Sequence, residues 1–473
     1  MALAMPIVAL GIVLFLGTSL VAACPSPANG AREPGRLPWL LGAGYLVGVL
    51  ALTLLMRAEA AMGVPFGLAT IGLPAAAIAA ACAAYAWRRS PALAETWRGS
   101  LATLRGDASG GFARVTWFAL LAWIGLRVAM LATEVALRPL YAWDAWSAWA
   151  TKAKTYFAMR TLVPFVDAAG WATSTTPVWF DAAPHQPVTL PLLQAWIATA
   201  AGAWDDASAA LPWVAFFVAI VLVVYGEVRR RGATPLYALA SAWLAGSLPL
   251  VGTQVALAGY ADLPLAAAFT LGALAGLRAI ATRSPVDVVV ALAALILVAT
   301  SKSSAWTWLV VVLPGFAAAA LGTAWHRRIG ILLVVASLAV VGIAARFPAF
   351  ALGPVSFRYA PVWENFAIES LLFANWHLIA PGIAGVLALR RRRCFDAEMA
   401  PLTLILAAGV LWIAMLAAFP AFRAWGADHL GLNRAVLVLA PFAIAWMAIA
   451  MLRAAPAEVP ASTADPEPAP QPA

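Results

Sequence analysis

The stretch YAWDAWSAWATKAK, residues 141–154, concentrates charged and aromatic side chains in a chain otherwise rich in alanine, leucine and valine. Asp144 is a lone carboxylate between Trp143 and Ala145, and Lys152 and Lys154 follow it closely. A carboxylate can take a proton from a hydroxyl nucleophile, and an ammonium group can bind a phosphate. The segment therefore has the residue types of a general base and of an anion-binding site.

Lysine is rare in this chain, with three lysines against 27 arginines. The third, Lys302, and also Arg434 are single cations in otherwise uncharged surroundings. A charge at membrane depth is costly unless it has a partner or a task, so we expect both to bind an anionic head group. A GC-rich genome also favours arginine over lysine, and for Lys154 a chance position is the alternative.

Helical spacing predicts how the opening stretch is oriented. At 100° per residue, Trp143, Trp146 and Trp149 form one stripe, and Asp144 and Lys154 lie on the opposite arc. Indoles favour head-group depth, so this pattern indicates an interfacial helix that fixes the carboxylate at the membrane surface. A surface helix whose aspartate is merely solvated is the alternative.

Two further polar residues have open roles. Asp262 precedes a proline-initiated apolar run, which fits either an N-cap or a site carboxylate. His185 could contact a phosphate or an acceptor, although a histidine without a second ligand nearby is commonly structural.

The chain has 473 residues, of which 64% are hydrophobic. Many of them form uncharged apolar runs long enough to span a membrane, and these runs must position the residues named above. The runs are continuous rather than alternating, so the predicted fold class is all-α, a polytopic membrane protein. About 13 transmembrane helices are expected, at residues 2–23, 37–56, 64–86, 115–136, 210–228, 235–252, 262–281, 286–301, 303–322, 329–347, 371–389, 400–419 and 432–453.

Arginine clusters between the spans predict the orientation. They share one side, which the positive-inside rule assigns to the cytoplasm of a bacterial inner membrane, so the net charge of +9 does not indicate nucleic-acid binding. We expect N-terminal helices and a cytoplasmic loop in residues 1–114, a catalytic module in 115–453 with a large periplasmic loop at 138–209, and a disordered cytoplasmic tail in 454–473.

Further motifs follow Asp144 along the chain: HQPVTLPLLQAW at 185–196, GYADLPLA at 259–266, TSKSSAW at 300–306 and Arg434. An acidic residue early in the first large external loop, a Trp-rich helix and the element at 185–196 together resemble the GT-C superfamily of membrane glycosyltransferases. This superfamily includes protein O-mannosyltransferases and the lipid A aminoarabinose transferase. The three later motifs resemble elements of its bacterial branch. Gln186 and Val188 depart from the proline-containing family element.

This resemblance implies transfer of a sugar from a polyprenyl-phosphate carrier to an acceptor hydroxyl on a lipid, glycan or protein, normally with inversion. Asp144 would be the general base. Lys152, Lys154, Lys302 and Arg434 would bind the donor phosphate, and His185, Gln186 and Asp262 are further possible site residues. Many members carry paired acids in the first loop, whereas Asp144 stands alone, so no obligatory metal is expected.

Two other classes compete with this interpretation. A transporter or flippase of a lipid-linked sugar commonly shows internal repeats, and no convincing repeat is evident in the span pattern. An O-antigen polymerase or ligase, or another envelope assembly protein, would be expected to rely more on arginine- and histidine-rich external loops.

Overall fold

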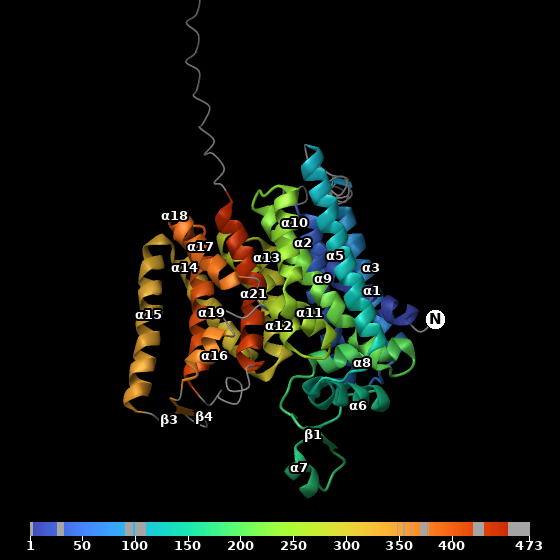
Figure 1. Ribbon diagram of the computed structural model, residues 1–473. Coiled ribbons are helices and arrows are strands. Elements are labelled where there is room, and N and C mark those ends of the chain that lie inside the picture. Colours follow the sequence, from blue (N-terminus) through green and yellow to red (C-terminus); the bar gives the residue numbers. More distant parts are fainter. Residues whose placement is uncertain are drawn as a thin grey trace, which may run out of the picture.

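The chain folds as a helical bundle in a computed structural model, which describes residues 3–25, 33–89, 98–99, 110–347, 349–352, 355–359, 361–368, 376, 378–419 and 430–452. Consecutive long helices alternate in direction, as Figure 1 shows. The predicted tail at 454–473 lies outside the described residues. The all-α class of a multi-pass membrane protein is confirmed.

Ten of the described helices are long and apolar enough to cross a membrane. They are α1 (Ala4–Ala23), α2 (Arg36–Ala61), α3 (Leu68–Arg89), α5 (Gly111–Leu137), α9 (Asp206–Arg230), α12 (Asp262–Thr282), α14 (Trp306–Leu321) with the 3-10 turn Ser303–Ala305 before it, α15 (Thr323–Arg346), α19 (Ala400–Ala418) and α21 (Leu430–Met451).

An eleventh span results if the bent pair α10 (Pro235–Ser247) and α11 (Pro249–Ala256) counts as one; its two parts meet at 57°. The expected count of 13 is higher because it includes two segments that form shorter helices, α13 (Pro285–Ser301) and α17 (Ile379–Leu389). At about 1.5 Å per residue, their 17 and 11 residues fall short of a hydrocarbon core of about 30 Å.

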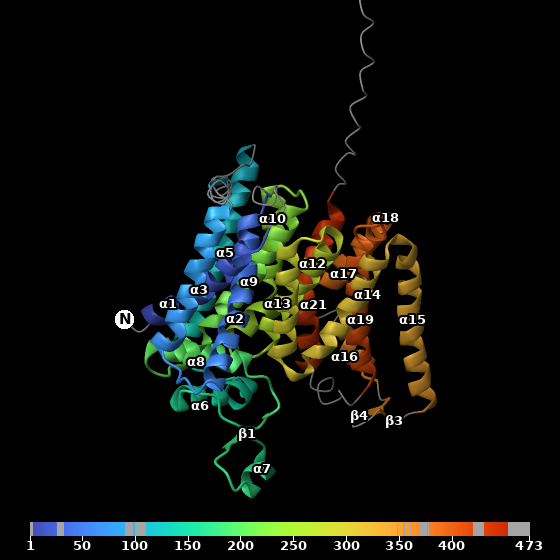
Figure 2. The ribbon, with the colours of Figure 1, turned by 180° about the vertical axis from the view of Figure 1, so that it is seen from behind.

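Helices α12 and α21 form the centre of the bundle and are its most deeply buried candidate spans. The ring of Phe269 on α12 packs edge-on against Phe442 on α21 at 6.0 Å and against Trp308 on α14 at 5.1 Å. Helix α15 is the least buried of the candidate spans, because no residue of its most apolar stretch is buried. Figures 1 and 2 both show it standing at one edge of the bundle.

Glycines allow α1 and α2 to pack with their backbones almost in contact. A Cβ atom at Gly17 would collide with the backbone oxygen of Gly44, and one at Gly48 would collide with the backbone oxygen of Val13. Small residues spaced by four are typical of helix pairs that approach closely in a membrane. This contact joins the N-terminal helix to the rest of the bundle.

The segment between α5 and α9 is the longest connection between spans among the described residues. It contains the π-helix η2 (Ala145–Ala150), α6 (Thr151–Met159), the parallel two-residue strands β1 (Phe165–Val166) and β2 (Trp179–Phe180), α7 (Ala168–Thr173) between them, and α8 (Thr189–Ala201). We call the end of the bundle that carries this segment the loop end.

The apolar stretch that follows Pro187 in this segment forms α8, which is too short to span the membrane. Leu190, Leu193 and Trp196 are fully buried, and the Trp196 indole donates to the backbone oxygen of Ala9. The helix therefore packs into the bundle. A second small element at the loop end is the antiparallel pair β3 (Ala349–Leu352) and β4 (Val355–Arg358), followed by α16 (Trp363–Ala367).

The opposite end carries α18 (Arg391–Cys394) and the last turns of α3, α9 and α12. Arginines gather there, at Arg88 and Arg89, Arg229 to Arg231, Arg327 and Arg328, and Arg390 to Arg393. We call it the arginine-rich end.

Candidate active site at the loop end of the bundle

Four charged side chains from distant parts of the chain meet at the loop end. The guanidinium of Arg434 donates to Asp262 through Nε at 2.6 Å and to Asp144 through Nη1 at 3.0 Å. The Lys302 ammonium donates to the other oxygen of Asp262 at 3.0 Å. All four were expected to be site residues, and the fold brings them into one cluster, which we call the Asp144–Arg434 cluster.

Helix ends position each member of this cluster. Asp262 is the first residue of α12, Lys302 follows the last residue of α13, Asp144 precedes η2, and Arg434 lies in the first turns of α21. Helices α12 and α21 start at the loop end and α13 finishes there, so their termini converge. Asp262 makes no capping hydrogen bond, because its carboxylate faces Lys302 and Arg434 instead of the helix backbone.

Burial differs sharply within the cluster. The side chains of Asp262 and Lys302 are 4% and 7% exposed, whereas that of Asp144 is 39% exposed. Charges removed from water must be paired, because an uncompensated buried charge costs several kcal/mol. The buried carboxylate of Asp262 therefore holds Lys302 and Arg434 in place. Asp144 is the carboxylate of the cluster that is accessible from solvent.

Tyr260 is a member of the site that sequence reasoning did not single out, although it lies in the quoted GYADLPLA element. The Arg434 guanidinium lies over its ring, 4.7 Å from the centroid, and its backbone oxygen accepts from the indole of Trp213 at 2.7 Å. Burial, and secondarily the carboxylate of Asp144, raise the pKa of Tyr260 above its usual value. The ring thus stays neutral and supports the guanidinium through a cation–π contact.

A cavity of about 250 Å³ opens beside the cluster. Its polar side is formed by Asp262, Lys302 and Arg434, and its apolar side includes Trp308, Trp412 and Leu416. Such a cavity offers cations to an anionic group and apolar walls to the hydrocarbon attached to it. A phosphate carried on a lipid has this combination of properties.

Gln186 joins the loop to this cluster. Its side-chain oxygen accepts a hydrogen bond from the backbone nitrogen of Ser303, the neighbour of Lys302, at 3.0 Å. The expected site residue therefore lies beside the cluster and holds the loop over it. His185, one residue earlier, is exposed to solvent.

The two lysines of the opening stretch lie away from the cluster. Lys152 is 1% exposed; its ammonium donates to the backbone oxygen of Ala183 at 2.6 Å and pairs with Asp181 at 3.5 Å. Burial lowers the pKa of Lys152 and raises that of Asp181, and each charge partly offsets the cost of the other. Lys154 pairs with Asp206 at 3.4 Å at the surface. Arg434, rather than either lysine, is the cation beside Asp144.

The tryptophan stripe is only partly present. Trp143 and Trp146 are 68% and 42% exposed and pack edge-to-face, but Trp149 is 2% exposed and belongs to the core. The prediction assumed α-helical spacing, whereas residues 145–150 form a π-helix, which turns each side chain by a smaller angle. The π-helix directly follows Asp144 and sets the direction in which the carboxylate points.

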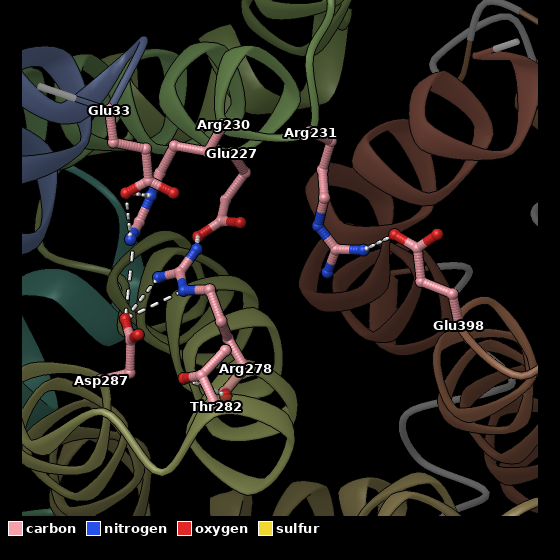
Figure 3. A network of polar contacts seen from close by, with 8 residues as sticks. All are labelled: Glu33, Glu227, Arg230, Arg231, Arg278, Thr282, Asp287 and Glu398. Carbon is pink, nitrogen blue, oxygen red and sulfur yellow. Dashed lines mark hydrogen bonds and ion pairs between the residues drawn. The ribbon is translucent and has the colours of Figure 1, made fainter. Parts of the chain in front are cut away.

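A second polar cluster lies at the arginine-rich end, where sequence reasoning saw only orientation signals. In Figure 3, Arg278 contacts Glu227 at 2.6 Å and Asp287 at 2.7 Å, and Arg230 contacts Glu33 at 2.7 Å. The ring of Trp39 lies against the guanidiniums of both arginines, at 4.5 and 4.9 Å. Each of these two guanidiniums contacts at least one carboxylate, as is expected of a structural ion network.

Within the described residues, no group of three or more His, Cys, Asp or Glu side chains could hold a metal ion. Comparisons with protein-family models, with curated proteins and with solved structures find no match to this chain. Its function must therefore be argued from the site itself.

Proposed function

We propose that the protein is a membrane glycosyltransferase that moves a sugar from a polyprenyl-phosphate-linked donor to an acceptor hydroxyl. The observation that carries this proposal is Arg434, whose guanidinium contacts both the partly exposed carboxylate of Asp144 and the buried one of Asp262. A base and a phosphate-binding group are the two requirements of this reaction, and here they are in direct contact.

Asp144 is the general base of the proposed reaction. Its carboxylate takes the proton of the acceptor hydroxyl while the oxygen forms a bond to the anomeric carbon. The bond from that carbon to the phosphate oxygen breaks, and polyprenyl phosphate leaves with the electron pair. Attack from the face opposite the leaving group inverts the anomeric centre.

Lys302 and Arg434 stabilise the phosphate as its charge grows. Positively charged groups that are already fixed in place cost little reorganisation at the moment of reaction. Asp262 is a positioning residue, because it holds both cations through two short contacts. The apolar walls of the adjoining cavity suit the first isoprene units of the carrier.

The test is the substitution Asp144→Asn in a deletion strain. Asparagine keeps the size and polarity of the side chain but cannot take the proton, so transfer should fall by about 10² to 10⁴. Mass spectrometry of envelope glycolipids and glycoproteins would show that the sugar modification is not restored, while the lipid-linked donor accumulates. Asp206→Asn is the matched control, because Asp206, the first residue of α9, is a partly exposed carboxylate at the same end of the bundle and pairs with Lys154.

Protein abundance in the membrane must match wild type for both variants. Restoration of the modification by Asp144→Asn at a wild-type rate would refute the role of Asp144. Failure of Asp206→Asn as well would point to a damaged loop rather than to lost base catalysis.

The bent pair α10 and α11 favours a second function, transport of a lipid-linked sugar across the membrane. Broken helices are common at the substrate sites of transporters, and this pair bends by 57° at Pro249. The two functions differ in what vesicles containing the purified protein do without an acceptor. A transporter would move the lipid-linked sugar between leaflets, whereas a transferase would leave its distribution unchanged.

A further inference from the structure

A groove runs between α15 and the helices α18 and α19 at the arginine-rich end. Its volume is about 980 Å³, larger than that of the cavity beside Asp262. Helix α15 stands apart from the bundle in both ribbon views, so the groove is bounded on one side by a helix with little packing of its own.

The groove has apolar walls below its mouth. Ile331, Val334 and Val335 line it from α15, and Leu404 lines it from α19. The three α15 side chains are exposed. From Arg327 to Val335 the lined part of α15 rises by about 12 Å, close to the thickness of one hydrocarbon leaflet, about 15 Å.

The mouth of the groove is basic. Arg327, Arg391 and Arg392 line it, all three are exposed, and none has an ion-pair partner among the residues that the structure describes. Other arginines at this end of the bundle do have carboxylate partners. Arg393 pairs with Asp396 and Glu398, and Arg231 pairs with Glu398. Arg230 and Arg278 are likewise paired with carboxylates, as Figure 3 shows.

We propose that this groove binds one anionic phospholipid, with its head-group phosphate on Arg327, Arg391 and Arg392 and an acyl chain along Val334 and Leu404. Three cations without carboxylate partners complement a negative head group, and the apolar walls continue from them for the depth of one leaflet. The site is at the opposite end of the bundle from the Asp144–Arg434 cluster, so it does not depend on the proposed function. By filling the groove, the lipid would complete the packing of α15.

Native mass spectrometry of the purified full-length protein tests the head-group part of this proposal. The probes are phosphatidylglycerol and phosphatidylcholine, added at equal concentration. We expect the wild type to retain phosphatidylglycerol preferentially. The variant Arg391→Gln/Arg392→Gln should bind it roughly thirtyfold more weakly, since each arginine near an anionic head group contributes about fivefold.

The matched control is Arg88→Gln/Arg89→Gln, which removes two exposed arginines from the end of α3, outside the groove. This control should retain phosphatidylglycerol as the wild type does. Equal retention by the Arg391→Gln/Arg392→Gln variant would overturn the proposal, and so would an equal loss in both double variants, because binding would then follow net charge alone.

The acyl-chain part is tested by filling the groove without changing its charge. Gly330 lines the groove, and a Cβ there would be 3.5 Å from the Leu404 side chain, an ordinary contact. Gly330→Leu should therefore fold and displace the acyl chain, lowering phosphatidylglycerol retention at least about tenfold by excluding several methylene groups. Gly342→Leu is the control on the same helix, where a Cβ would meet nothing within 4 Å.

Val334→Asn is a second groove variant, which places an amide in the path of the chain without added bulk. Phosphatidylglycerol retention at the wild-type level by both groove variants would overturn the proposal in favour of a surface head-group contact. Displacement of phosphatidylglycerol by a lower concentration of polyprenyl phosphate would also overturn it and identify the carrier lipid as the occupant. Thermal unfolding midpoints equal to wild type would show that each variant is folded.

Discussion

Arg434 links the two carboxylates of the proposed active site, and the four charges of the cluster balance. An incoming phosphate has to compete for nitrogens that carboxylates already occupy. Asp144 is the partner it can displace, because Asp262 is 4% exposed and also held by Lys302, whereas Asp144 is 39% exposed. Binding of the donor phosphate to Arg434 would therefore leave the Asp144 carboxylate available to take a proton.

Single charged residues in apolar surroundings were the part of the site most open to prediction. Asp144, Asp262, Lys302 and Arg434 stand out in the sequence because membrane burial makes an unpaired charge costly. Which charges pair could not be predicted, because pairing depends on how helix ends meet. Lys152 is the clearest case, since its partner Asp181 lies in irregular chain that no periodicity describes.

At the residue scale we predict that Lys152→Met destabilises the protein far more than Lys154→Met. Removing Lys152 leaves Asp181 buried without compensation, at a cost of about 3–5 kcal/mol. Lys154 is 49% exposed and its pair with Asp206 is worth less than about 1 kcal/mol. Equilibrium unfolding in detergent measures both.

The double variant Lys152→Met/Asp181→Asn provides the control for charge. It removes the buried carboxylate as well, so part of the lost stability should return. A double variant no more stable than Lys152→Met alone would show that packing, not the ion pair, is what Lys152 supplies.

At the scale of elements, helices with the length and apolarity of a membrane span could be predicted. Segments whose backbone departs from an α-helix could not be predicted as well. The tryptophan stripe of residues 143–149 was expected from 100° steps, and the π-helix Ala145–Ala150 changes those steps. Local sequence does not encode that departure. It follows from burying Trp149 in the core while Asp144 reaches Arg434.

The close approach of α1 and α2 gives a prediction at this scale. Gly48→Ala places a methyl group against the backbone oxygen of Val13, so the helices must separate. Overpacking of this kind typically costs about 1–3 kcal/mol. The thermal unfolding midpoint in detergent should fall accordingly. Gly11→Ala is the control on α1, because a Cβ there meets nothing within 4 Å; equal midpoints for the two variants would contradict the packing argument.

For the whole molecule, the two ends differ in chemistry. The loop end carries the Asp144–Arg434 cluster and the segment with α6, α7 and α8, and the opposite end gathers the arginines. Hydropathy made most of the spans predictable, because a run of about twenty apolar residues is typical of a transmembrane helix. It could not separate a full span from a short helix such as α17, because the 11 residues of this helix are as apolar as those of a span.

The positive-inside rule predicts that the loop end faces the periplasm, and this can be measured in whole cells. Ser174→Cys, in the exposed chain after α7, should react with a membrane-impermeant thiol reagent in intact cells. Ala397→Cys, exposed at the arginine-rich end, should react only after lysis. Cys24 and Cys82 are replaced by serine in both, and Cys394 is buried. The reverse pattern would invert the orientation and exclude a periplasmic active site.

Helix α12 takes part in both charged clusters, through Asp262 at its first turn and Arg278 near its last. The two residues are 16 positions apart, about 24 Å along the axis, and their relative direction is set by the number of residues between them. Adding or deleting one residue would turn one end by about 100° against the other, so only one cluster could keep its partners. The segment between them should accept side chains of similar volume but no change in length.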